Sequence, residues 1–114
     1  MISSKKYKTG EAIEEFNPFN ISIIQLQKKI DQASRRLKAI SHPNRLKIVS
    51  LLIDTEYTVQ SLSIKTGIPQ STVSQHLSVL REREIVEYRK DGQYSHYSLS
   101  DKNIYELYLT AMQF

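Results

Sequence analysis

Two short amphipathic segments joined by a tight "TGIP" turn constrain the fold of this chain more than any other feature. The first segment, 58–66, begins at Thr58, a residue type that caps helices, and Gly67 is typical of the position just past a helix. Pro69 suits the first turn of a second helix, predicted over about 69–83. Two short helices joined in this way predict a helix-turn-helix.

The second of these helices has an unusual polar face. At helical spacing, only Val73, Leu77 and Leu80 are suited to a core. The opposite side carries mostly short hydrogen-bonding side chains in place of the usual Lys and Glu: Gln70, Ser71, Ser74, Gln75, Ser78 and Arg81. A DNA major groove admits one α-helix, and its floor presents donors, acceptors and thymine methyl groups to such side chains. The face therefore indicates nucleic-acid binding; the alternative is a polar surface helix of a generic bundle.

The residues that follow predict a β-hairpin over about 86–99, because Asp91-Gly92 lies between two runs of alternating apolar and polar residues. A last helix, 101–113, is expected to be capped by Asp101. Upstream, Pro43 suits the first turn of a helix over 43–53. The predicted fold is mostly α with a small hairpin: a winged helix-turn-helix in the order helix-helix-helix-helix-hairpin-helix.

The first predicted helix begins at Asn20 as its cap and continues to Ile40. Its apolar residues recur at alternating steps of three and four, as in a coiled-coil seam. They are Ile23, Leu26, Ile30, Ala33, Leu37 and Ile40. A seam this narrow packs either on its own core or on a second copy, and we favour a dimer contact. Residues 1–19 are expected to form a flexible arm, and residues 20–114 a single DNA-binding and dimerisation domain.

Composition excludes several classes of function. The net charge of +4 and pI of about 9.3 favour polyanionic partners only weakly. The absence of cysteine excludes disulfides, thiolate metal sites and cysteine nucleophiles. No apolar run approaches the ~18 residues of a membrane span, and no secretory signal is recognisable, so we expect a cytoplasmic protein. No Gly-rich phosphate loop or catalytic motif is present, so neither an enzyme nor a bound cofactor is expected.

The segments "ISHPNRLKIVSLL" and "STVSQHLSVLRE", followed by "IVEYRKDGQYSHYSLSD", resemble the ArsR-type winged-helix transcriptional repressors of bacteria and archaea. The similarity extends from about Arg36 to Asp101. It implies a homodimer joined through its first and last helices, bound to a near-palindromic operator in double-stranded DNA, with repression relieved by an inducer. The dimer residues that fit this implication are Ile23, Leu26, Ile30, Leu37, Ile104, Leu107, Tyr108 and Ala111.

The resemblance also implies which residues contact DNA. By match to the family's recognition helix, the residues implied to contact bases or phosphates are Gln70, Ser71, Thr72, Ser74, Gln75 and His76. Arg81 lies on the same helix, and the wing residues implied to approach the minor groove or backbone are Arg89, Lys90, Gln93 and Tyr94. The alternative is a winged helix used as a protein-interaction module or as an architectural DNA binder.

Two departures from the family pattern bear on these expectations. Family members often have glycine just after the recognition helix, where this chain has Glu84, so the helix must use another cap or run longer. Metal-sensing members carry cysteines in the third helix or Asp and His pairs in the last. Here Asp101 stands without the histidine that would accompany it, since Asn103 occupies that position. No metal is therefore expected, and any inducer is a small molecule of unknown kind.

Overall fold

The computed structural model describes residues 20–114, and the predictions for the arm, 1–19, lie outside the described residues. The chain divides into two units, residues 1–34 and residues 35–114. The described part of the first unit contains the larger part of helix α2 (Ile23–Ile40). The second unit contains the end of α2 and all the elements that follow it.

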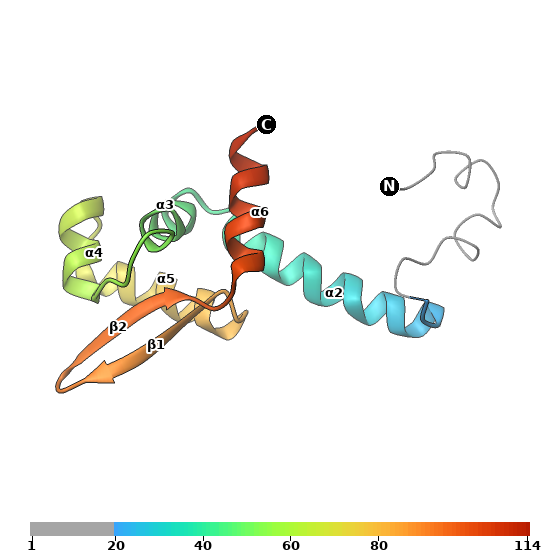
Figure 1. The fold of residues 1–114 in the computed structure, drawn as a ribbon, viewed down its shortest axis with the longest axis horizontal. Helices are drawn as coiled ribbons and strands as arrows, with labels where there is room; N and C mark the ends of the chain where they lie inside the picture. Colours follow the sequence, from blue (N-terminus) through green and yellow to red (C-terminus); the bar gives the residue numbers. More distant parts are fainter. Residues whose placement is uncertain (1–19) are drawn as a thin grey trace. The chain divides into compact units, whose positions relative to one another are not determined.

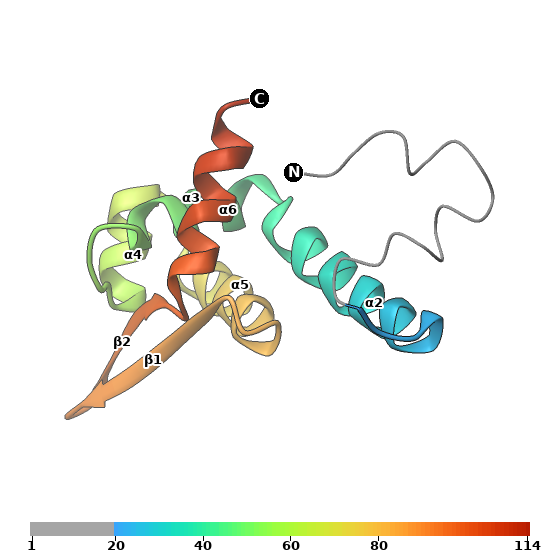
Figure 2. The same cartoon turned by 45° about the vertical axis from the view of Figure 1, so that its right-hand side comes forward.

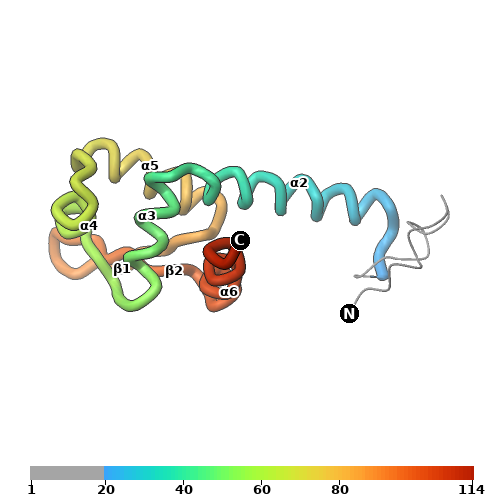
Figure 3. Tube along the Cα trace, turned by 90° about the horizontal axis from the view of Figure 1, so that it is seen from above, coloured from blue at the N-terminus to red at the C-terminus, as the bar shows by residue number. Residues whose placement is uncertain are grey.

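The second unit is a winged helix-turn-helix. After α2 come α3 (Pro43–Leu52), α4 (Val59–Thr66), α5 (Gln70–Glu82), β1 (Val86–Asp91), β2 (Tyr94–Leu99) and α6 (Lys102–Met112). Helices α3, α4 and α5 pack on one another, and the hairpin packs against all three (Figure 1). Helix α6 packs against β2; it is seen side-on in Figure 1 and nearly end-on in Figure 3. The predicted fold class and element order are confirmed.

The start of α2 corrects the prediction of Asn20 as its cap. Asn20 has a positive φ of 51° and precedes the helix by three residues. Instead, Ser22 Oγ accepts a hydrogen bond from the Gln25 N–H (3.2 Å), and Gln25 Oε1 accepts one from the Ser22 N–H (3.1 Å). This reciprocal pair is a capping box, which satisfies two donors at once. Asn20 has Ile23 three residues later, which cannot reciprocate.

Side chains at the predicted positions cap two later helices. Thr58 Oγ1 accepts from the Ser61 N–H at the start of α4, and Asp101 Oδ1 accepts from the Asn103 N–H at the start of α6. The caps at Thr58 and Asp101 are therefore confirmed.

The turn between α4 and α5 is fixed by its own hydrogen bonds. Gly67 adopts a φ of 75°, and its N–H donates to the Ser63 carbonyl (2.9 Å). The Ser63 hydroxyl donates to the Ile68 carbonyl (2.6 Å). A Cβ on Gly67 would meet no atom within 4 Å, so glycine is needed for its left-handed backbone and not for space.

The hydrophobic core lies in residues 35–114. Its buried members are Ala39, Ile40, Ile48, Val49, Leu52, Leu62, Ile68, Val73, Leu77, Leu80, Ile85, Val86 and Ile104. Helix α5 contributes the three residues predicted to face inward, and its opposite face remains exposed. Burial on one side thus fixes the rotation of α5 and determines which of its side chains face solvent.

The end of α5 keeps the geometry of a glycine cap although Glu84 occupies that place. Glu84 has a φ of 59°, its N–H donates to the Arg81 carbonyl, and the Ile85 N–H donates to the Leu80 carbonyl. These two bonds form a Schellman motif, and the side chains of Leu80 and Ile85 are both buried in the same core. Arg36 Nε donates to the Arg83 carbonyl (2.9 Å) at the same helix end. The helix therefore neither runs longer nor changes its type of cap.

Replacing Glu84 with glycine is expected to stabilise the protein by about 0.5–1 kcal/mol. A left-handed non-glycine residue costs roughly 1 kcal/mol, and the ion pair of Glu84 with Arg36 (3.6 Å) is too exposed to offset this. The free energy of unfolding from urea titrations measures the gain. Glu84→Ala is the control, because it removes the carboxylate and keeps the strain. Equal stabilities for the two variants would contradict the assignment of strain to this position.

Candidate nucleic-acid interface

The exposed face of α5 is polar over its whole length. Gln70, Ser71, Ser74, Gln75 and Ser78 are all exposed on it. No side chain caps the helix start at Pro69, and the first backbone N–H groups of the helix have no acceptor among the described residues. Free N–H groups at the positive end of a helix favour an anion such as a phosphate. The face thus combines hydrogen-bonding side chains with an anion-attracting helix start.

Two of the predicted contact residues on α5 lie at the edge of this face and are half-buried: Thr72 and His76. The His76 ring packs against His42, with the ring centroids 4.7 Å apart. His42 itself caps α3, because its Nδ1 accepts from the Asn44 N–H (3.1 Å). Burial lowers the pKa of His76 below its usual range, and the nearby His42 and Arg45 lower it further. His76 therefore also has a packing role between α5 and α3.

The hairpin places the predicted wing residues at its tip. Strand β1 pairs with β2 in antiparallel register, with Asp91 opposite Tyr94, so the connecting loop is Gly92-Gln93. Gly92 has a φ of 62° at the first loop position, as type II′ turns require. The exposed residues at and beside this loop include Lys90, Gln93 and Tyr94. The structure thus brings these three predicted wing residues together.

Arg81 connects α5 to the wing. Its guanidinium lies over the Tyr88 ring, 4.5 Å from the centroid. Tyr88 in turn packs against Tyr97 on the paired strand, with the ring centroids 5.4 Å apart. Partial burial raises the pKa of Tyr97 above its ordinary value, as expected for a ring on the inner face of the wing. This stack holds α5 and the hairpin in a fixed relation.

Arg89, the fourth predicted wing residue, is engaged with Glu56, a partner that the sequence did not reveal. Arg89 Nη2 lies 2.8 Å from Glu56 Oε1, and Arg89 Nε donates to both carboxylate oxygens. These hydrogen bonds hold the pKa of Glu56 below its ordinary value. The adjacent Tyr57 exchanges two backbone hydrogen bonds with Tyr97 on β2. Glu56 and Tyr57 thus attach the wing to the loop before α4, in addition to the Arg81 stack. A pair of residues in a loop has no periodic pattern in the sequence, so only the folded geometry reveals this attachment.

The predicted dimer residues divide between exposed and core positions. On α2, Ile30 (48% exposed) and Leu37 (53%) lie seven residues apart in an accessible stripe with Ile23, while Leu26 is half-buried. On α6, the structure corrects Ile104, which is 4% exposed and belongs to the core of its own chain. Leu107 and Tyr108 also pack against that core, and Ala111 is exposed.

The large apolar side chains that α6 leaves accessible are a different set: Tyr105, Leu109 and Met112, followed by Phe114. Their spacing of four and three residues marks a second apolar stripe on the same helix. That spacing was available in the sequence as a signal. A partner surface on α6 is therefore more accessible along this stripe than along the predicted one.

No group of three His, Cys, Asp or Glu side chains within residues 20–114 is placed to hold a metal ion. Asp101 instead caps α6. No helix within the same residues is long and apolar enough to cross a membrane.

A helix-turn-helix followed by a two-stranded wing defines the winged-helix class of regulators. Residues 42–88 match the family described as "Bacterial regulatory protein, arsR family". The biofilm growth-associated repressor of Xylella fastidiosa is 38% identical over 82 residues, which cover 72% of each of the two chains. The chain therefore belongs to the ArsR family. The predicted family, and a role in transcription regulation and not in catalysis, are confirmed.

Two further relatives support this placement. The transcriptional activator HlyU of Vibrio cholerae is 36% identical over 87 residues, covering 76% of this chain and 79% of HlyU. A homodimeric winged helix-turn-helix DNA-binding domain from Mycobacterium bovis superposes with a TM-score of 0.75 at 27% identity. That match covers 82% of this chain and 85% of the other. The common fold thus includes the helix-turn-helix and the wing.

Proposed function

We propose that this protein is a homodimeric repressor that acts in the cytoplasm and binds a near-palindromic operator in double-stranded DNA. One observation carries the proposal: the exposed polar face of α5 ends beside a wing with basic residues near its tip. Support comes from the relatives, among them a repressor and a homodimeric DNA-binding domain. Any inducer that relieves repression is expected to be a small molecule and not a metal ion.

Base recognition and phosphate binding are assigned to different side chains. Ser74 and Gln75 lie on the exposed face one turn into α5, where the helix would enter a major groove. The side-chain amide of Gln75 can form two hydrogen bonds with one adenine base. Lys90 near the wing tip and the free N–H groups of α5 would bind phosphates, which add affinity without sequence information.

A fluorescence-anisotropy titration tests the proposal. The labelled DNA is the region just upstream of the protein's own gene, with random DNA of equal length as competitor and salt varied. Saturation at one dimer per site, with the preference retained as salt rises, supports the proposal. Equal and salt-sensitive binding to both DNAs favours an architectural role, and no binding to either favours a protein-interaction module.

Replacing Glu56 with glutamine is expected to raise affinity for specific and random DNA alike, by roughly two- to tenfold. The Glu56 carboxylate pairs with Arg89 and repels phosphates, so its neutralisation frees Arg89 for the DNA backbone. The dependence of log K on log[salt] should steepen by up to about 0.9 per protomer. Glu106→Gln on α6 is the control, because it removes the same negative charge from an exposed position away from the wing. Weaker binding by Glu56→Gln would instead show that the ion pair positions the wing.

A further inference from the structure

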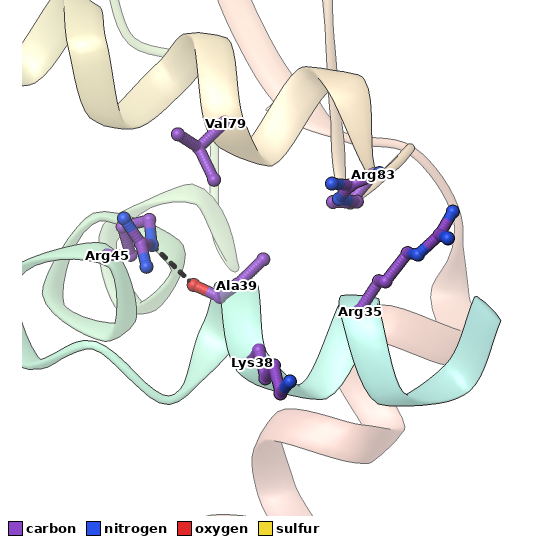
Figure 4. Close-up of a pocket in the computed structure, with 6 residues that line it drawn as sticks. All are labelled: Arg35, Lys38, Ala39, Arg45, Val79 and Arg83. Atoms are coloured by element: carbon purple, nitrogen blue, oxygen red, sulfur yellow. Dashed lines mark hydrogen bonds between the residues drawn. The ribbon is translucent and has the colours of Figure 1, made fainter. Parts of the chain in front are cut away.

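A pocket lined by four basic side chains lies where the end of α2, the first turn of α3 and the end of α5 meet. Its volume is about 180 Å³. The lining residues are Arg35, Lys38, Ala39, Arg45, Val79 and Arg83. Figure 4 shows Arg35 and Arg83 on one side of Ala39 and Arg45 on the other. All of them belong to the second unit, and the surrounding helices can be followed in Figure 2.

The charges of this pocket are unbalanced. Its lining contains no carboxylate, and the neighbouring Glu84 is paired with Arg36, which lies outside it. Within residues 20–114, the side chains of Arg35, Lys38 and Arg83 make no ion pair. Arg45 uses Nε to donate to the Ala39 carbonyl (2.6 Å), which fixes its position and leaves its terminal N–H groups available. Four cations around one space repel one another, and a bound anion removes that repulsion.

We propose that this pocket binds a phosphate group. The planar guanidinium matches phosphate oxygens two at a time, and the Lys38 ammonium adds a point charge. The pocket has room for a phosphate group, because its volume is about twelve times the ~15 Å³ that a single water needs. Val79 lies four residues beyond Gln75 on α5, about 6 Å further along the helix axis. A backbone phosphate of DNA bound at the polar face is therefore one source of the group, and a free phosphorylated molecule is the other. Only the first source rests on the proposed function.

The double variant Arg35→Gln/Lys38→Gln tests the pocket without touching the α5 face or the bond from Arg45 to Ala39. Its control is Lys28→Gln/Lys102→Gln, which removes the same charge from exposed positions outside the pocket. In the first measurement, DNA affinity is determined at several salt concentrations for wild type and both variants. In the second, DNA-free protein is titrated with inorganic phosphate and with pyrophosphate, and the amide resonances of Ala39 and Val79 are followed.

If the phosphate comes from DNA, the pocket variant has a salt slope shallower than the control by about 0.9 per protomer. If it comes from a free molecule, the slopes agree, and phosphate or pyrophosphate shifts both resonances in a saturable way that the pocket variant loses. Equal slopes with no saturable shift overturn the proposal. Failure of the wild type to prefer its own upstream DNA counts against the proposed function alone, because the phosphate titration still decides whether the pocket binds the anion.

Discussion

Replacement of Ile30 and Leu37 by glutamate is expected to yield a monomer whose operator affinity is lower by at least roughly a hundredfold. Both side chains are about half exposed on α2, seven residues apart on one face. Burying such a side chain against a partner contributes about 1.5–3 kcal/mol, and a dimer buries two from each protomer. A monomer contacts one half-site only, so it loses most of the margin of specific over non-specific binding. Sedimentation velocity measures the assembly state, and anisotropy the affinity.

Gln25→Glu/Gln32→Glu is the matched control, because it adds the same charge to two exposed positions of α2, also seven residues apart, on the side of the helix away from the apolar stripe. This control should remain dimeric and bind the operator nearly as wild type does. A variant that stays dimeric after the loss of Ile30 and Leu37 would contradict a dimer contact through α2. The exposed stripe of Tyr105, Leu109 and Met112 on α6 would then be the next surface to change.

Local features of the fold could be predicted from sequence because each depends on residues within one or two turns. Thr58 and Asp101 cap their helices through bonds that span only a few residues, and Gly67 needs only its own backbone freedom. The inward face of α5 follows from apolar spacing alone. These signals place the helix-turn-helix and the wing, and with them the exposed polar face that forms the candidate site.

Features that depend on distant residues could not be predicted in this way. Arg36 bonds the end of α5 across 47 residues of sequence, and Glu56 reaches Arg89 across 33. Helix α6 is apolar on two faces, so its periodicity cannot decide which face meets the core. The fold decides it: α6 packs against β2, and Ile104 is buried in the core. The conformation of Glu84, which stands where the family often has glycine, is likewise decided only in the fold. There two backbone hydrogen bonds and the burial of Leu80 and Ile85 in the core maintain the left-handed cap.

Substitution of Gln75 by alanine is expected to cost about 1–3 kcal/mol per half-site on the operator, or a factor of roughly 5 to 150 in affinity for each of the two half-sites. Gln75 is exposed on the polar face of α5, on the side opposite the buried Leu77 and Leu80, so the change leaves the core intact. The loss should be confined to the specific site, because random DNA presents no fixed partner for the amide. Competition anisotropy with operators altered at single base pairs measures it, and the preference at one position per half-site should relax.

Lys90→Ala is the comparison that separates base recognition from phosphate binding. Lys90 is exposed on β1 near the wing tip, where a cation adds affinity for any DNA. Its loss should weaken binding to operator and random DNA by similar factors and make the salt dependence shallower by about 0.9 per protomer. If Gln75→Ala behaves in this way too, α5 is held on the DNA by its backbone contacts alone. Recognition of the operator's base sequence would then have to come from the wing or from the shape of the DNA.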